Sequence, residues 1–405
     1  MNSTLATAAL LWLGAGFLGY GSAGTPPAAA SAPTGILVGK LAEGSAYDRL
    51  WSLPLLYKDE ANPVLQELAF QGQLQTQYAY GSDDSGNFGS GDKPDANTWG
   101  DVDVRRFRFG IKARLFHSLK FHSLLDLYPD LSPRIYQRTA EAYLTYSPCD
   151  AFSLSVGKAE LKFTREQEIS SREILTFERS QLVNQFYGGE LTGAWISGKN
   201  LAGGWFYELG AYGNDRTDEW TTLDGGTVIL AKLGYNYTGS TSFDNAMAEL
   251  HYLHNSDPGY ASPGDPPSAP YPDAVAVSNT ITEGRFGLET EAFWGDGPLG
   301  KADVWGVTAI PSWFLTEKLQ CVAMLEYACS SDPNGIFLRY RYEGQAPGGV
   351  KSGDAFFACY SGLNYYLYGH KLKLMSGVKY TFMDGDTQAE DFNGWTGLVG
   401  LRMAY

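Results

Sequence analysis

Apolar and polar residues alternate with a period of two along stretches of this chain that are ten or more residues long. Successive side chains of a β-strand point to opposite faces, so such alternation predicts strands with one apolar and one polar face. Between residues 67 and 80 one face carries Leu68, Phe70, Leu74, Tyr78 and Tyr80, and the other carries Gln71, Gln73, Gln75 and Gln77. Strands of soluble proteins usually have about five or six residues, whereas a tilted strand needs about 9–11 to cross a bilayer. The pattern therefore favours membrane-spanning strands over the strands of a soluble sandwich.

The polar face of a second stretch, residues 106–115, is cationic. Phe107, Phe109 and Ile111 lie on one face, and the opposite face carries Arg106, Arg108, Lys112 and Arg114. Near the C-terminus the apolar residues Leu374, Val378 and Phe382 similarly oppose Lys371, Lys373 and Lys379. We predict that these seven cations line the polar interior of a barrel, because the interior of such barrels is polar.

Sixteen candidate strands follow from this alternation. They lie at residues 66–80, 102–116, 118–128, 138–147, 151–158, 188–198, 202–213, 226–238, 244–255, 275–285, 286–295, 303–314, 318–330, 354–368, 370–383 and 393–405. Short connections such as residues 147–150 alternate with long ones such as residues 81–101. A sheet in hydrocarbon must close on itself to satisfy its edge strands. The sequence thus predicts an all-β fold: a closed antiparallel transmembrane β-barrel of about sixteen strands over residues 66–405.

Composition agrees with this fold class. Aromatic residues make up 14% of the chain and charged residues 19%, below the roughly 25% of globular proteins. Aromatic residues also gather near the ends of the candidate strands, where an interfacial girdle is expected. The predicted girdle contains Tyr78, Tyr80, Tyr143, Tyr146, Tyr235, Tyr237, Trp305, Trp313, Tyr365, Tyr366 and Tyr368.

The N-terminus has the pattern of an export signal. No acidic or basic residue precedes Lys40, and an apolar run from Leu5 to Tyr20 is followed by the small residues 21–24. We predict a signal peptide at residues 1–24, although it lacks the usual Lys or Arg; a disordered leader rich in Ala and Pro is the alternative. Residues 25–65 would then be an N-terminal extension, periplasmic or poorly ordered.

Residues 159–186 interrupt the rhythm of the hairpins with a long charged segment. We predict that it folds inward as a constriction loop; an ordinary surface loop is the alternative. Its charged residues include Arg165, Glu166, Arg172, Glu178 and Arg179. Because glutamates and arginines interleave, part of the positive charge is expected to be used in ion pairs that hold the loop.

Several of these segments resemble the phosphate-selective porin O and P family. The resemblance rests on residues 104–110 (VRRFRFG), 112–116 (KARLF), 140–144 (AEAYL), 156–158 (VGK), 170–172 (SSR) and 176–180 (TFERS). It implies a sixteen-stranded homotrimeric barrel whose inner wall and constriction loop draw anions, including phosphate, through the pore. At matching positions, Arg106, Arg108, Lys112 and Arg114 would be wall residues, and Arg172 and Arg179 would lie on the loop.

Little in the sequence points to an enzyme. His251 and His254 are three residues apart in a candidate strand and so face opposite sides, which argues against a shared metal ion. A lipase-like role for His122, and weak calcium sites in the acidic segments near Asp83 and Asp384, are minor alternatives. The four cysteines are not expected to form disulfides. We therefore predict no catalytic residue, no metal and no cofactor.

These observations together predict a porin in the outer membrane of a diderm bacterium. Its partners would be outer-membrane lipid and small hydrophilic solutes, with anions preferred, and it would not bind nucleic acid. A general, non-selective porin is nearly as well supported, because loop glutamates and Asp126 oppose the cations. The alternative from another class is a secreted β-rich adhesin or sandwich without a pore.

Overall fold

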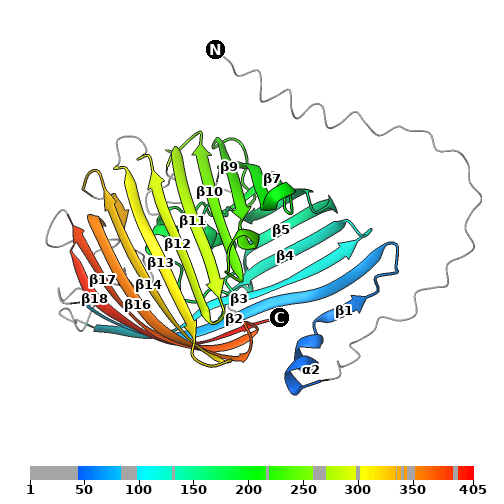
Figure 1. The fold of residues 1–405 in the computed structure, drawn as a ribbon, viewed down its shortest axis with the longest axis horizontal. Coiled ribbons are helices and arrows are strands. Elements are labelled where there is room, and N and C mark those ends of the chain that lie inside the picture. Colours follow the sequence, from blue (N-terminus) through cyan, green and yellow to red (C-terminus); the bar gives the residue numbers. More distant parts are fainter. Residues whose placement is uncertain are drawn as a thin grey trace, which may run out of the picture. The chain divides into compact units, whose positions relative to one another are not determined.

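The computed structural model describes residues 44–83, 98–129, 133–215, 219–258, 271–297, 302–333, 335–338, 342–343, 352–385 and 391–405. Within them, sixteen long strands form one antiparallel sheet (Figure 1). These strands are β2 (Leu65–Asp83), β3 (Thr98–Leu115), β4 (Leu119–Leu127), β5 (Tyr136–Cys149), β6 (Phe152–Glu160), β7 (Glu190–Gly198), β8 (Trp205–Gly213), β9 (Thr227–Asn236), β10 (Asn245–Asn255), β11 (Asp273–Glu283), β12 (Phe286–Gly295), β13 (Val304–Phe314), β14 (Leu319–Ser330), β16 (Ser352–Tyr368), β17 (Leu372–Gly385) and β18 (Phe392–Ala404). Each of them overlaps one of the sixteen predicted strands.

The sheet closes on itself. The last strand, β18, pairs with the first long strand, β2, from Gly394 opposite Asp83 to Ala404 opposite Gln73. The remaining neighbours pair in chain order, except that the two-residue strand β15 (Ile336–Phe337) joins the edge of β16. This confirms the predicted fold class, a closed antiparallel barrel of sixteen long strands.

The two faces of the barrel differ as the alternation predicts. On β2 the outward Tyr78 is 48% exposed, whereas the inward Gln75 is fully buried. On β18 the outward Val399 is 59% exposed, whereas the inward Arg402 is 2% exposed. Apolar side chains therefore face outward, where the lipid of a bilayer would surround them, and polar side chains face the interior.

Two residues of the predicted aromatic girdle turn inward instead. Tyr366 is 5% exposed and meets the ring of His370 edge-on, while its neighbour Tyr365 is 43% exposed on the outer face. Tyr143 packs against His122 on the inside, three residues from the outward Tyr146. The prediction was wrong for both because aromatic residues separated by an odd number of positions cannot share a face of a strand.

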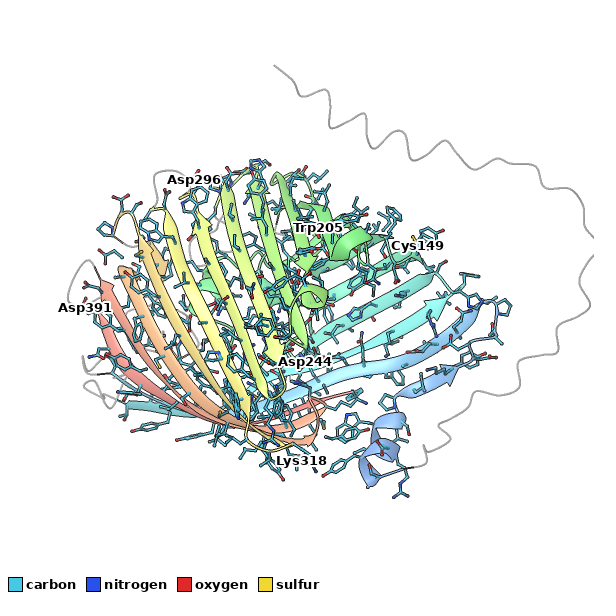
Figure 2. All side chains as sticks on the ribbon, viewed as in Figure 1. Cys149, Trp205, Asp244, Asp296, Lys318 and Asp391 are labelled. Carbon is cyan, nitrogen blue, oxygen red and sulfur yellow. The ribbon has the colours of Figure 1, made fainter. Side chains whose placement is uncertain are left out.

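The barrel has one end with short turns and one end with long connections. The connections at one end include residues 116–118, 150–151, 284–285 and 315–318, whereas those at the other end include residues 84–97 and 256–272. Figure 2 shows Asp244 and Lys318 at the first end of the strands and Asp296 and Asp391 at the second. The strand pair β3 and β4 is joined through Phe116 and His117, both of which have positive φ. Such turns are typical of the periplasmic end of outer-membrane barrels.

Part of the predicted N-terminal extension packs on the short-turn end. It forms helix α2 (Ala46–Ser52), begun by a capping box at Ser45, and strand β1 (Leu55–Lys58), which pairs with the start of β2 (Figure 1). Trp51 Nε1 donates to Ala404 O at 2.5 Å, and Tyr368 Oη donates to Asp48 Oδ1 at 2.6 Å. β1 thus covers the edge of β2 beyond the point where β18 ends.

The predicted signal peptide, residues 1–24, lies outside the described residues. Of the segments considered for calcium, the residues after Asp83 and the residues directly after Gly385 also lie outside them. No helix of the described residues has the length and apolarity needed to cross a bilayer. All four cysteines are among the described residues, and each has a free thiol.

Candidate functional site: the barrel interior

The segment between β6 and β7, residues 161–189, contains two short helices. In α3 (Arg165–Glu168), Thr164 and Gln167 form a capping box, and in α4 (Gln181–Gln185), Ser180 accepts the backbone N–H of Val183 at 3.2 Å. Capping satisfies the N–H groups that the first turn of a helix leaves unpaired. The segment is therefore an ordered structure with its own local hydrogen bonds.

Apolar residues of this segment pack against inward side chains of the barrel. Leu182, Val183 and Phe186 are each at most 2% exposed and share a hydrophobic cluster with Val304 of β13 and Phe293 of β12. Phe186 and Phe293 are stacked with ring centroids 5.9 Å apart. The hydrophobic effect thus holds the segment against the wall formed by β12 to β14.

The adjoining strands β16 to β18 hold the segment by its backbone carbonyls. Lys373 of β17 donates to Ile174 O at 2.6 Å, Asn364 of β16 donates to Leu175 O at 2.8 Å, and Arg402 of β18 donates to Phe177 O at 3.1 Å. Elsewhere in the segment, Glu168 pairs with Lys232 of β9, and Ser171 O accepts a hydrogen bond from Gln75 of β2 at 2.8 Å. Since β2 and β9 lie about half the ring of strands apart, residues 161–189 contact both sides of the barrel from within. We call them the inward loop.

The charged residues of the inward loop are largely engaged within the loop or with the wall. Arg179 Nε donates to Glu166 O at 2.9 Å, and Arg165 Nη1 lies 3.1 Å from Glu168 and 3.4 Å from Glu249. Glu178 accepts two hydrogen bonds from Arg105 at 2.5 and 2.9 Å. Arg172 makes only a long contact, 3.5 Å, with Gln71 Oε1. Among the predicted loop arginines, Arg172 is thus the one least committed to holding the loop.

Glu166 is a buried carboxyl at the base of the inward loop. It is 5% exposed and accepts the backbone N–H of Ser180 at 3.0 Å. Burial, together with the nearby Glu326, raises the pKa of Glu166 to about 7, against the opposing effect of the Ser180 hydrogen bond. Since the pKa of an unfolded Glu is lower, the docked loop binds the proton more tightly than the released loop does.

We expect docking of the inward loop to weaken as the pH rises. The stabilisation is fully present below the ordinary Glu pKa and is lost as the pH passes about 7, with a change on the order of 3 kcal/mol. The protection factor of the Ser180 amide in hydrogen exchange, corrected for intrinsic rates, should fall between pH 5 and pH 8. Glu166→Gln should remove this dependence; a variant that retains it would show that another group is responsible.

The four predicted wall cations of β3 all lie on its inner face, and each has a polar partner. Arg106 donates to Gln75 Oε1 at 2.8 Å and is 9% exposed, and Arg108 forms an ion pair with Asp126. Lys112 Nζ lies 3.3 Å from Glu67 and is half exposed, and Arg114 pairs with Glu60. Much of the cationic charge is therefore balanced locally by carboxylates.

The three lysines predicted near the C-terminus lie in different surroundings. Lys371 is in the turn before β17, with Nζ 5.3 Å from the centre of the Tyr368 ring. Lys373 is fully buried beneath the inward loop, and Lys379 Nζ lies 3.1 Å from Glu343. Of the three, only Lys379 and Lys373 are on the inner face of the strand, and Lys373 is covered.

Sequence reasoning missed three arginines of the interior. Arg105 points inward because a β-bulge shifts the register of β2 and β3 between Gln75 and Thr76, so Arg105 and Arg106 both face the lumen. Arg138 of β5 bridges Asp126 at 2.8 Å and Glu190 at 2.6 Å. The third, Arg402, lies on the inner face of β18, where it is 2% exposed and donates to Gln77 Oε1 at 2.8 Å.

Four arginines surround a cavity of about 260 Å³ that is lined by β3, β4, β5 and the connection after β4. Arg105, Arg106, Arg108 and Arg138 line it, together with Asp103 and Asp126. Arg106 Nε has no hydrogen-bond partner in the described part of the chain. The cavity is therefore polar and is lined by four guanidinium groups, which suits an anion.

One cluster in the described residues has the composition of a metal site. Ligand atoms of Glu168, Glu249 and His251 lie within 4.8 Å of one another. However, Lys232 pairs with Glu168, and Arg165 contacts both glutamates, so cations of the protein already balance these carboxylates. His251 is fully buried, whereas His254 pairs with Asp273 and is partly exposed, so the two histidines face opposite sides as predicted.

A closed sixteen-stranded barrel with a polar interior and an inward loop is the architecture of porins. Residues 73–237 match the sequence model of a family described as phosphate-selective porin O and P. This match confirms the predicted resemblance over that part of the chain. A comparison with curated protein sequences gave no match.

Solved structures of porins and other outer-membrane proteins share the fold. The anion-selective porin from Comamonas acidovorans is 12% identical, with a TM-score of 0.57, covering 84% of this chain and 99% of that one. OmpT of Vibrio cholerae is 12% identical with a TM-score of 0.54, covering 86% and 100%. The channel DcaP of Acinetobacter baumannii is 14% identical with a TM-score of 0.52, covering 86% and 99%. Family and fold together confirm the predicted location in the outer membrane.

Proposed function

We propose that the chain is a passive outer-membrane channel for small hydrophilic solutes and that it catalyses no reaction. The observation that carries this proposal is the closed ring of strands with an apolar outer face and a charged, polar inner face. A secreted sandwich or adhesin would need its apolar face to pack against a second sheet, whereas here that face is exposed around the whole ring. The inward loop would narrow the passage and set its selectivity.

Within this function we propose a preference for anions, phosphate among them. Support comes from the cavity lined by Arg105, Arg106, Arg108 and Arg138, and from Arg172 on the inward loop. The formal charge of −15 does not oppose this, because charges more than about 10 Å from the passage are screened at 0.1 M salt. A general porin is the second candidate, favoured by the ion pairs of Asp126 with Arg108 and Arg138.

We expect Arg106→Ala combined with Arg108→Ala to shift the reversal potential in a salt gradient toward cation selectivity. Both guanidinium groups line the arginine cavity, and Asp126 would lose one of its two cationic partners. The matched control is Arg285→Ala combined with Lys318→Ala, which removes the same charge from the short-turn end. A cation-selective wild type, or a selectivity that both double variants leave unchanged, would contradict the anion preference and favour a general porin.

We also propose a homotrimer, because one of the matching structures, OmpT of Vibrio cholerae folded in vitro, is described as a trimer form. Chemical cross-linking in outer-membrane fractions tests this. A three-chain product is expected, and a product limited to single chains would contradict it.

A further inference from the structure

A second and larger cavity, of about 960 Å³, lies inside the barrel near the short turns. Its wall is formed by residues of neighbouring strands from β2 to β9, and Lys162, at the start of the inward loop, also lines it. Figure 1 shows these strands side by side, from blue through cyan to green. The volume is within the range of about 300–1,000 Å³ that is typical of small-molecule sites.

A continuous line of rings crosses this wall. His122 of β4 stacks on Tyr143 of β5, with centroids 4.9 Å apart and planes at 17°. Tyr143 meets Trp195 of β7 edge-on at 5.3 Å, and Trp195 stacks on Tyr212 of β8 at 5.9 Å and 24°. Every step lies within the 4.5–7 Å separation of interacting aromatic pairs.

Glycines leave the space that these rings occupy. A Cβ at Gly193 would lie 2.5 Å from the ring of Tyr212, and so would a Cβ at Gly210. A Cβ at Gly157, on the strand between Tyr143 and Trp195, would lie 2.8 Å from Tyr143 Cβ. The rings therefore lie close along the wall. Tyr212 is 4% exposed and backs the line, whereas Tyr143 and Trp195 are only partly buried and line the cavity.

Two lysines beside the rings have no ion-pair partner among the described residues. They are Lys120, two positions before His122 on the same face of β4, and Lys162 of the inward loop; both line the cavity. Among the carboxylates of this wall, Glu67 lies 3.3 Å from Lys112, Glu141 lies 2.8 Å from His122 Nε2 and Glu160 lies 3.6 Å from Arg179. Glu208 also lines the cavity and has no ion-pair partner within 4 Å among the described residues. Lys120 and Lys162 thus place two positive charges beside the rings, opposed by the carboxylate of Glu208.

We propose that this cavity binds solutes that carry a carboxylate on a flat aromatic ring. The proposal rests on the channel function above and names the class of solute that this cavity selects. Tyr143 and Trp195 would contact the ring of the solute, and Lys120 and Lys162 its carboxylate. A neutral sugar fits less well, because the hydroxyls of the wall bond each other, Thr145 to Ser155 at 2.7 Å and Ser147 to Ser153 at 2.8 Å.

The test is the interruption of single-channel current by added solutes in a planar bilayer. Benzoate carries both ring and charge, acetate only the charge, benzyl alcohol only the ring, and maltose represents sugars. Benzoate should interrupt the current at the lowest concentration. Trp195→Leu and Lys162→Gln should each raise its half-blocking concentration about tenfold. Trp294→Leu, on the outward face and 40% exposed, is the matched control and should leave block unchanged.

The possible results separate this inference from the channel function. Steady channels that benzoate blocks no better than acetate, or that maltose blocks best, would overturn the inference and leave the channel standing. The same holds if benzoate block is unaffected by both Trp195→Leu and Lys162→Gln. Preparations without any channel current would overturn the proposed function, and this inference with it.

Discussion

Deletion of residues 395–405 is expected to abolish assembly of the barrel in the outer membrane. These residues form most of β18, which pairs with β17 along one edge and with β2 along the other. Without them, both neighbouring strands would expose unpaired N–H and C=O groups to hydrocarbon, at a cost of several kcal/mol for each group. On gels of outer-membrane fractions, the folded full-length protein should migrate differently before and after heating. The truncated protein should show no such folded form.

A deletion outside the ring of strands is the control for this experiment. Helix α2 (Ala46–Ser52) contacts the barrel end through Trp51 but forms no part of the ring, so its removal should leave assembly intact. If the protein lacking residues 395–405 is still folded in the outer membrane, the closed barrel is not required for insertion and the role assigned to β18 is wrong.

Removal of residues 167–178 should raise the single-channel conductance several-fold. These residues form the central part of the inward loop, which contacts β9 through Glu168 and β2 through Ser171, on two sides of the barrel interior. The deletion joins Glu166 to Arg179, which already meet, since Arg179 Nε donates to Glu166 O at 2.9 Å. The two ends of the deletion therefore lie near each other, and the deletion removes the obstruction.

A full-length variant provides a second test of the loop. Lys373→Met with Arg402→Met removes two donors that hold the carbonyls of Ile174 and Phe177. We expect unsteady current with frequent transitions, because the loop loses its attachment to β17 and β18. Arg285→Met with Lys318→Met is the control for loss of two cations. An unchanged conductance after deletion of residues 167–178 would mean that the loop does not narrow the passage.

The strands could be predicted from the sequence because each strand has to satisfy two different environments. Lipid outside and a polar interior impose a period of two on every strand, and this period survives even where the apolar residues are few. The strand ends were predicted less well: β2 begins near the expected position at Leu65 but extends to Asp83. Strand residues outside the bilayer pair because a partner strand lies beside them, and the alternation of apolar and polar residues in the sequence does not mark them.

The error at Arg105 has a specific cause. A single extra residue in β3 reverses the face of every residue beyond it, and nothing in strict alternation marks its place. One signal was available. Strict alternation puts Arg105 on the lipid face, where an arginine destabilises the barrel by about 2–4 kcal/mol at the midplane. A bulge that turns Arg105 inward avoids this cost.

The surroundings of the predicted site residues could not be read from the sequence. Lys373 is on the inner face, as the pattern indicates. It is nevertheless buried, because the inward loop covers it, and its hydrogen-bond partner Ile174 lies 199 residues earlier in the chain. Bonds from a side chain to a backbone carbonyl leave no mark in the sequence of the acceptor. The pairing of Asp126 with Arg108 and Arg138 likewise depends on the register of β3, β4 and β5.

Conductance of the purified protein in a planar lipid bilayer tests the central claim most directly. The account predicts discrete, long-lived current steps in salt solution, because a closed barrel with a charged interior admits hydrated ions while its apolar outer face anchors it in lipid. Protein unfolded by boiling in detergent should give no steps. Folded, detergent-extracted protein that inserts into the bilayer and yet passes no current would contradict the claim that this barrel is a channel.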